Sequence, residues 1–254
     1  MKTTRLRCVV SGASELFSVH TNIVIQRHPL NFLSRASDLL GIVFGATCPG
    51  CGRIAGQVCR DCLIRIDQAS KQNPIAYHDD VIVSYTYSAE IRKIILAFKY
   101  RNMRSSLRFL GDAVADRILL EYKRGLTKID AVTWAPTTDK RKTARGHDHA
   151  ELIAKYFARK IDVQCIKLLT RSSDQPQTGK SREERLVGPI FAAHKLRSEH
   201  VLVFDDVITT GATLNSATHA LYQAGAGLVS RVAIASTVLW QSSTGSCALA
   251  KAKK

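Results

Sequence analysis

The sequence predicts an α/β fold in which a mostly parallel sheet is flanked by helices and preceded by a small N-terminal cysteine module. Two observations lead to this prediction. Between about residues 80 and 240, apolar segments of strand character alternate with segments of helical periodicity, which is the pattern of parallel sheets. Before them, four cysteines occur as two close pairs, in a spacing typical of metal-binding modules.

The composition is that of a globular protein with an excess of positive charge. The 254 residues include 37 Lys and Arg against 21 Asp and Glu, a net charge of +16. Such a field favours polyanionic ligands: nucleic acid, anionic lipid or phosphorylated metabolites. A charge run is more often a solvated face than a binding site, so nucleic-acid binding stays an alternative. No apolar run approaches the ~20 residues that span a bilayer, and no signal peptide is evident, so we expect a cytoplasmic protein.

The chain divides into four predicted regions. Residues 1–28 lack a steady period and are expected to form a poorly ordered extension. Residues 29–70 combine an amphipathic helix with the cysteine pairs, because apolar residues recur at three- and four-residue steps from Leu30 to Val43. Residues 80–240 form the main domain, and residues 241–254 a flexible basic tail.

The four cysteines have the spacing C-x2-C-x7-C-x2-C and are Cys48, Cys51, Cys59 and Cys62. Each pair can turn tightly so that two thiolates point at one tetrahedral cation, and Gly50 and Gly52 permit the first turn. Disulfides are disfavoured in the cytosol. We therefore expect structural Zn²⁺ with four thiolate ligands, which leave no open position for catalysis; an iron–sulfur centre is the alternative.

Strand and helix patterns alternate along the main domain. Ser88 can cap a helix that begins at Ala89. The apolar stripe of this helix consists of Ile91, Ile94, Ile95 and Phe98. Its basic residues are therefore expected elsewhere on the surface; they are Arg92, Lys93 and Lys99. The other elements that we predict are strands at 81–87, 129–136, 163–169, 201–204 and 230–236, helices at 107–123, 149–160 and 214–223, and loops at 137–146 and 171–188.

The stretch from Val201 to Thr213 has the clearest chemistry. Four apolar residues predict a buried strand, and Asp205 and Asp206 follow where that strand is expected to end. A loop of small and hydroxyl-bearing residues then enters a helix. Such a loop offers backbone N–H groups and the positive end of the helix dipole to a phosphate. The two carboxylates can accept hydrogen bonds from a vicinal diol, so the stretch suits a ribose 5-phosphate.

This stretch resembles the phosphoribosyl-diphosphate (PRPP) binding motif of type I phosphoribosyltransferases, without a gap over its thirteen residues. A hydrophobic strand that ends in two acids also occurs as a Walker B element, but the chain has no GxxxxGK[ST] loop to accompany it. A solvated loop after an ordinary strand is the other alternative. The resemblance implies a type I phosphoribosyltransferase-like fold, with the cysteine module near the place of the usual hood subdomain.

The resemblance also implies a set of site residues. Asp205 and Asp206 would be catalytic and would hold the ribose hydroxyls directly or through Mg²⁺. The phosphate loop would cradle the 5-phosphate through Thr209, Thr210, Gly211, Ala212 and Thr213. The loop after Pro136 matches the place of the diphosphate loop, with Thr137, Thr138, Lys140 and Arg145. Residues 174–185 match the place of a mobile loop that closes over diphosphate, with Lys180, Arg182 and Arg185.

Over about residues 30–238 the arrangement resembles the ComF family. The features that carry this resemblance are the amphipathic helix, the four-cysteine module, Lys99-Tyr100, Arg145-Gly146, Gln177–Ser181 and the PRPP motif. The family usually follows Arg-Gly with Phe-Asn-Gln, where this chain has His147-Asp148-His149, and it usually has Asn where this chain has Gly188.

Two functions follow from these resemblances. The first is an enzyme that transfers phosphoribose from PRPP to an undetermined nitrogenous acceptor and releases diphosphate. The second is an accessory protein of DNA uptake in natural transformation, which binds single-stranded DNA and uses the PRPP site as a sensor. The low aromatic content, 7%, offers few side chains for base stacking. A homodimer is left open, because no residue pattern specifies an assembly.

Overall fold

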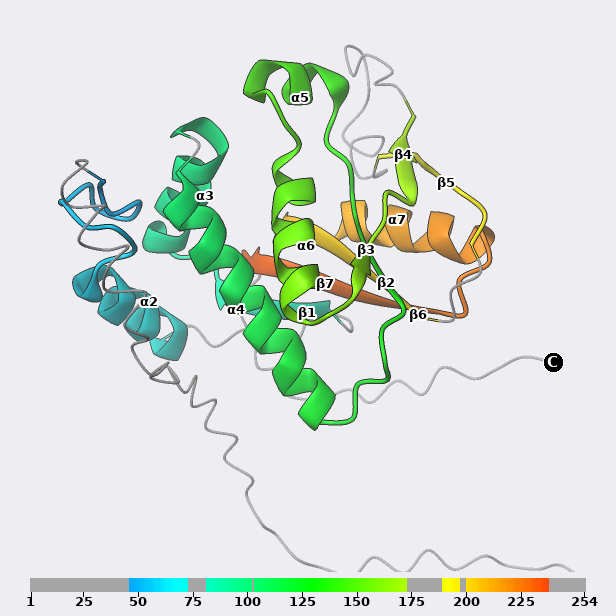
Figure 1. Cartoon of the computed structure of the whole chain (residues 1–254), viewed down its shortest axis with the longest axis horizontal. Helices are drawn as coiled ribbons and strands as arrows, with labels where there is room; N and C mark the ends of the chain where they lie inside the picture. Colours follow the sequence, from blue (N-terminus) through cyan, green and yellow to red (C-terminus); the bar gives the residue numbers. More distant parts are fainter. Residues whose placement is uncertain (1–45, 73–80, 102, 173–188, 197–199, 238–254) are drawn as a thin grey trace, which may run out of the picture.

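The computed structural model describes residues 46–72, 81–101, 103–172, 189–196 and 200–237 (Figure 1). Several predicted features lie outside these residues: the N-terminal extension, the amphipathic helix and the basic tail. The predicted mobile-loop residues Lys180, Arg182 and Arg185 lie outside them as well. The domain boundaries given above therefore stay predictions. Within the described residues, no helix is long and apolar enough to cross a membrane.

The core of the fold is a parallel sheet of five strands in the order β1-β7-β6-β2-β3 (Figure 1). Every neighbouring pair in this sheet is parallel, as the strand–helix alternation predicts. A separate antiparallel pair is formed by β4 and β5. The strands are β1 (Val81–Thr86), β2 (Ala131–Trp134), β3 (Gln164–Cys165), β4 (Leu169–Arg171), β5 (Phe191–Ala193), β6 (His200–Ile208) and β7 (Leu228–Ser236).

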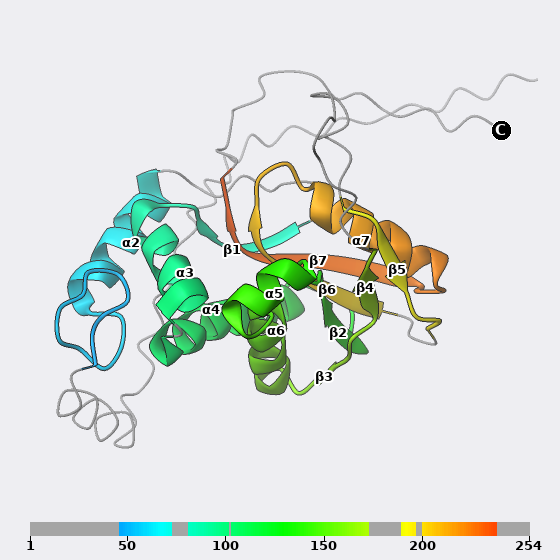
Figure 2. The same ribbon diagram turned by 90° about the horizontal axis from the view of Figure 1, so that it is seen from above.

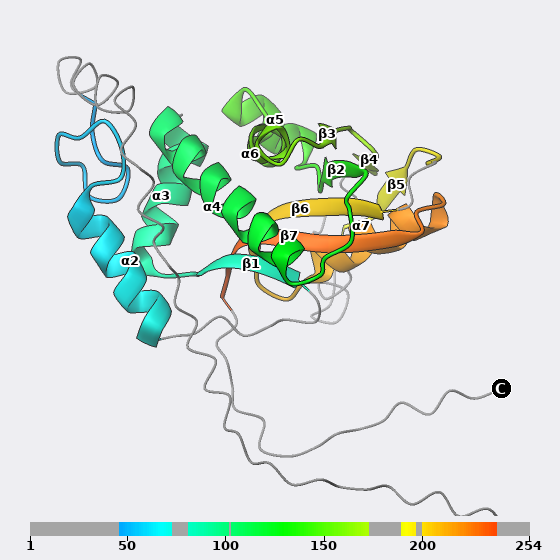
Figure 3. The ribbon, with the colours of Figure 1, turned by 60° about the horizontal axis from the view of Figure 1, so that its bottom comes forward.

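Helices cover both faces of the sheet. On one face lie α3, α4 and α6, and α7 covers the other (Figure 3). Strand β6 shows why: Leu202 and Phe204 belong to the core beneath α3, α4 and α6, whereas Val201 and Val203 belong to the core beneath α7. The helices are α2 (Arg60–Gln72), α3 (Ala89–Arg101), α4 (Arg104–Lys123), α5 (Asp139–Arg145), α6 (His149–Lys160) and α7 (Ala212–Gln223).

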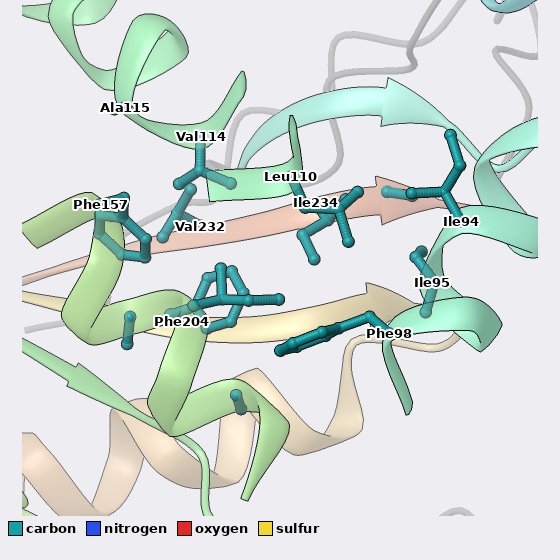
Figure 4. Close-up of a cluster of buried hydrophobic side chains, with 14 of the residues drawn as sticks. Ile94, Ile95, Phe98, Leu110, Val114, Ala115, Phe157, Phe204, Val232 and Ile234 are labelled. Atoms are coloured by element: carbon teal, nitrogen blue, oxygen red, sulfur yellow. The ribbon is translucent and has the colours of Figure 1, made fainter. Parts of the chain in front are cut away.

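The larger core confirms the predicted apolar stripes. Ile94, Ile95 and Phe98 point from α3 toward Phe204 and Ile234 of the sheet (Figure 4), and each of the three is at most 3% exposed. The predicted cap is also present, because the backbone N–H of Ile91 donates to Ser88 Oγ at 3.3 Å. Helix α3 is therefore fixed by both its apolar face and its start.

Two predicted strands differ from those observed. The predicted strand at 163–169 is wrong in its second half, because β3 ends at Cys165 and Leu169 begins β4, which pairs with β5 instead of the main sheet. The strand predicted at 201–204 extends to Ile208, because β6 stays paired with the nine-residue strand β7 as far as Ile208 and Ser236. Pairing with a long neighbour overrides the low strand propensity of the two acids.

The predicted basic loop at 137–146 is instead the short helix α5. Its signals are local. Thr138 accepts a hydrogen bond from the N–H of Arg141 as the N-cap, and Asp139 places an acid in the first turn. Arg145 lies in the last turn, and Gly146 ends the helix with a φ of 80°, which favours glycine. The basic side chains of α5 are exposed or half-buried. The helix itself lies at the top of the molecule in Figure 1.

The cysteine module packs beside α3, away from α7 (Figure 2). Its helix α2 contacts α3 and β1, and Cys48, Cys62 and Ile66 join the same core as the α3 stripe. The module is consequently attached to the main domain through a shared apolar core.

Candidate functional site

The two acids of the predicted motif lie on β6 where the sheet becomes narrower. Pairing between β2 and β6 ends at Trp134 and Phe204, whereas pairing between β6 and β7 continues past Asp205 and Asp206. The acids therefore stand at the carboxyl end of β2, next to the loop that follows it. Ligands of open α/β sheets bind at this edge.

The predicted phosphate loop connects these acids to α7. Thr209 and Thr210 are exposed, and Gly211 adopts a left-handed φ of 76° at the N-cap of α7. Among the residues that the structure describes, no side chain caps the helix start at Gly211, and the N–H of Ala212 makes one long hydrogen bond, 3.4 Å, to Thr210 Oγ1. Thr213 lies in the first turn, so the helix begins two residues before the predicted Leu214. Backbone N–H groups of a helix start are therefore available to an anion.

Helix α3 also reaches the acids. Lys99 makes an ion pair with Asp206, and the Lys99 side chain is only 18% exposed. The prediction that Lys99 lies on the surface is therefore wrong. The sequence contains a signal for this position, because Lys99 follows Ile95 by four residues and Ile91 by eight, on the same helix face. Sequence reasoning gave this lysine no role in the site.

The next residue of α3 makes a second connection. Arg145 donates from Nη2 to the Tyr100 hydroxyl at 3.0 Å, and its guanidinium lies 5.0 Å from the centroid of the Tyr100 ring. Tyr100 is nevertheless 66% exposed. The end of α3 thus contacts β6 through Lys99 and α5 through Tyr100. As a result, the cationic side chains of Lys99 and Arg145 both lie at this end of α3.

Asp205 has surroundings that disfavour its charge. Burial and the neighbouring charge of Asp206 raise the pKa of Asp205 to about 8, although the Asp206 N–H and Lys99 favour its ionised form. That N–H donates to Asp205 Oδ1 at 2.8 Å. At neutral pH and without ligand, Asp205 is therefore expected to hold a proton, whereas the ion pair of Lys99 is made with Asp206.

The four residues predicted in the diphosphate loop differ in their surroundings. The N–H of Thr137 donates to Asp148 Oδ2 at 2.9 Å, and Thr138 is buried as the cap of α5. Lys140 is exposed on α5, whereas Arg145 is half-buried against Tyr100. Asp148, which is 4% exposed, also accepts from the N–H of Ala150 and so joins the loop to α6. No role was assigned to it from the sequence.

Two histidines stand where the ComF family usually has Phe and Gln. The rings of His147 and His149 have centroids 4.9 Å apart, and His149 packs edge-on against Phe98. His149 is 4% exposed, and its Nδ1 makes no hydrogen bond among the described residues. Burial, followed by the charges of His147 and Arg145, lowers the pKa of His149 to about 4. The ring is therefore neutral at physiological pH.

This lowered pKa predicts a loss of stability in mild acid. In the unfolded chain His149 becomes protonated below a pKa of about 6.5, whereas in the folded chain it stays neutral down to about pH 4. The unfolded chain therefore binds more protons between these two pH values, and the free energy of unfolding falls as pH falls from about 6.5 to about 4. His149→Gln should remove up to about 3 kcal/mol of that fall. Urea unfolding at pH 7 and pH 4.5 measures it; equal pH dependence in the two proteins would contradict a buried neutral ring.

The four cysteines come together as predicted. Their sulfur atoms all lie within 4.8 Å of one another, with 3.8 Å between Cys48 and Cys62 and 3.6 Å between Cys51 and Cys59. A Zn–S bond of about 2.3 Å places the corners of a tetrahedron about 3.8 Å apart, so the spacing fits a four-thiolate site. The cluster is thus compatible with zinc binding.

Both positions of the first turn that carry glycine require it for a structural reason. Gly52 has a φ of 80°, a conformation that side chains rarely adopt. A Cβ at Gly50 would lie 2.8 Å from Cys62 Sγ. The Arg65 Nη2 donates to the same sulfur at 3.0 Å, and its Nε lies 3.3 Å from Glu90 in the first turn of α3. The cluster is therefore connected to α3 by polar contacts as well as by the core.

Comparison with known proteins agrees with this architecture. The model of the phosphoribosyl transferase domain matches residues 148–252. The chain is 26% identical over 194 residues to Competence protein ComFC of Bacillus subtilis strain 168, covering 72% of this chain and 74% of that protein. It is 26% identical over 193 residues to Competence protein F of Haemophilus influenzae, covering 70% and 79%.

Solved structures include a purine phosphoribosyltransferase from Pyrococcus horikoshii. It is 15% identical, covers 62% of this chain and 78% of its own, and has a TM-score of 0.34. The two competence proteins, the domain match, the parallel sheet and the four-cysteine cluster together lead to one assignment. These findings support assignment of the chain to the ComF family, with a type I phosphoribosyltransferase-like fold.

Proposed function

We propose that this protein binds PRPP and transfers its phosphoribosyl group to a nitrogenous acceptor, with release of diphosphate. The observation that carries the proposal is a pair of acids near the carboxyl end of β6, followed within a few residues by the start of α7, which no side chain among the described residues caps. Asp205 and Asp206 would accept from the two ribose hydroxyls. The 5-phosphate would be held by Thr209, Thr210, Gly211, Ala212 and Thr213.

In this reaction the bond between the anomeric carbon and diphosphate breaks as the acceptor nitrogen bonds to that carbon. Positive charge develops on the ribose ring, and the nearby carboxylates stabilise it electrostatically. Arg145 and Lys140 on α5, with Thr137 and Thr138, would bind the diphosphate as negative charge accumulates on it. The carboxylates of the two acids are oxygen donors of the kind that Mg²⁺ prefers, so they would help to hold a Mg²⁺ ion that binds with PRPP. Such an ion would lower the negative charge of the leaving diphosphate.

For the cysteine cluster we propose Zn²⁺ in a structural role. Four sulfur ligands at tetrahedral spacing leave no position for a substrate, so the ion would stabilise residues 46–72 and take no part in transfer. The short distance from Cys62 to α3 through Arg65 would then fix that helix beside the PRPP site.

Calorimetric titration with PRPP and Mg²⁺ tests the proposed ligand. We expect binding with a Kd in the micromolar range, and weaker binding of ribose 5-phosphate, which lacks the diphosphate. Diphosphate release that depends on an added purine, pyrimidine or other nitrogenous base would identify a transferase and its acceptor. Absence of heat with both ligands, at concentrations up to the millimolar range, would refute PRPP binding.

A second candidate is an accessory role in DNA uptake with single-stranded DNA as the partner. Two observations favour it: the relatives are named competence proteins, and the chain carries a net charge of +16. In that case PRPP would act as a signal at the same site. Affinity for a single-stranded oligonucleotide should fall steeply with added salt, because charge-driven binding releases counterions. Diphosphate release unaffected by any base, together with PRPP-dependent DNA affinity, would favour this candidate over the transferase.

A further inference from the structure

We propose that Lys99 is a substrate-binding residue that leaves Asp206 when PRPP arrives and then binds the diphosphate group. This inference rests on the proposed function, because it assumes that the acids of β6 hold the ribose. It assigns to the end of α3 an active part in recognising the diphosphate of the donor.

The starting contact is the ion pair between Lys99 and Asp206. Both side chains are mostly shielded from water, with 18% of Lys99 and 23% of Asp206 exposed. An ion pair in such surroundings is stronger than one on the open surface, so the lysine keeps the carboxylate occupied while no ligand is present. A ribose hydroxyl that donates to Asp206 must therefore compete with this ammonium group.

The covalent structure of PRPP places the diphosphate near the displaced lysine. The diphosphate is attached to the anomeric carbon, which is bonded to the carbon that bears the 2-hydroxyl. When the acids hold the ribose hydroxyls, diphosphate oxygens come within a few ångströms of those acids. The four-carbon stem of a lysine is flexible and its three N–H donors can rotate, so Lys99 can reach an oxygen there without movement of α3.

The neighbouring contact supports the same assignment. Tyr100 follows Lys99 in the chain and accepts a hydrogen bond from Arg145 of α5, the helix in which we place part of the diphosphate site. Lys99 and Arg145 are thus brought to the same end of α3 from two different elements. Two cations on one side of the acids match the charge of a diphosphate better than either does alone.

A purely structural ion pair would behave differently. If Lys99 only holds Asp206 in position, then removing its charge should weaken every ligand that uses Asp206, whether or not the ligand has a diphosphate. If Lys99 moves to the diphosphate, the loss should be confined to PRPP. Ribose 5-phosphate should then bind as well as before or better, because it no longer competes with the ammonium group.

The experiment compares PRPP and ribose 5-phosphate binding by calorimetry in the wild type and in Lys99→Gln, which keeps an N–H donor for Asp206 without the charge. We expect PRPP affinity to fall about 10- to 100-fold and ribose 5-phosphate affinity to stay within about twofold or rise. Lys99→Arg, which restores the charge, should recover part of the PRPP affinity. Lys93→Gln removes the same charge from an exposed position of α3 and should change neither ligand.

Equal losses for the two ligands in Lys99→Gln would overturn the inference, and so would unchanged PRPP affinity. Lys99→Met gives a second test should the glutamine variant fail to fold, as judged by thermal unfolding, and it should show the same selective loss. If the wild type binds PRPP, these outcomes reject the role of Lys99 alone. If the wild type binds neither ligand, the proposed function itself is rejected together with the inference.

Discussion

Asp205→Asn should weaken PRPP binding roughly 10- to 100-fold and, at pH 8, should make the protein more stable than the wild type. Affinity falls because an amide replaces a carboxylate as the acceptor for a ribose hydroxyl, and hydrogen bonds to charged groups are worth about 1.5–3 kcal/mol. The amide oxygen can still accept from the Asp206 N–H, so the backbone of β6 should keep its conformation.

The gain in stability follows from the raised pKa of Asp205. Because the folded chain holds this proton up to about pH 8 and the unfolded chain releases it near pH 4, stability falls as pH rises between these values. Asparagine cannot ionise and avoids that loss. The same linkage predicts that wild-type PRPP affinity rises from pH 7 to pH 8, since a carboxylate is the better acceptor, and that this rise is absent in the variant.

Calorimetry with PRPP and urea unfolding at pH 6 and pH 8 measure both effects. Asp162→Asn is a matched control: the same chemical change occurs in the turn after α6, where the residue has a φ of 56° that asparagine tolerates. The control should bind PRPP normally. If Asp205→Asn binds PRPP as tightly as the wild type does, the Asp205 carboxylate is not part of the PRPP site.

Cys62→Ser should release the metal and unfold residues 46–72. Cys62 is fully buried, and its sulfur lies close to Cys48 and accepts a hydrogen bond from Arg65. Burial and the neighbouring cysteines raise the pKa of the Cys62 thiol to about 12 in the absence of metal. At neutral pH this thiol therefore loses its proton only when a cation binds to the sulfur. Structural zinc contributes about 10–16 kcal/mol in small zinc-dependent modules, which makes this the largest loss we expect from one substitution.

Elemental analysis and hydrogen exchange measure this prediction. The wild type should contain about one zinc per chain, and Cys62→Ser much less, with fast amide exchange through α2. Cys165→Ser is the control, because this cysteine lies in β3 outside the metal cluster. Slow exchange in α2 after complete removal of zinc by a chelator would show that the apolar contacts with α3 suffice to fold the module.

Patterns that depend on neighbouring residues were read correctly from the sequence. The stripe of α3 and the cap at Ser88 follow from spacing and side-chain chemistry alone, and the same holds for the clustering of four cysteines. Helix α5 could have been found in the same way, from Thr138, Asp139 and Gly146. It was missed because a seven-residue helix of basic side chains has no apolar stripe to mark it.

Features that depend on distant partners were not accessible. Nothing in residues 163–169 indicates that the chain leaves the main sheet after Cys165, because Leu169 pairs with Ala193 from a later part of the chain. The length of β6 is likewise set by β7. The ion pair of Lys99 joins residues more than a hundred positions apart, and only the helix face of Lys99 is visible in the sequence.

The extended pairing of β6 with β7 has a consequence for motion at the site. Parallel pairing continues from Asp205 and Ala233 to Ile208 and Ser236, and the Thr237 N–H donates to Ile208 O beyond it. Amide protons along this ladder should exchange with solvent only in rare, nearly global openings. The acids are therefore carried by an almost immobile strand, whereas the cations come from the tip of α3 and from a seven-residue helix. We therefore expect the cationic side chains to adjust to a bound substrate more than the acids do.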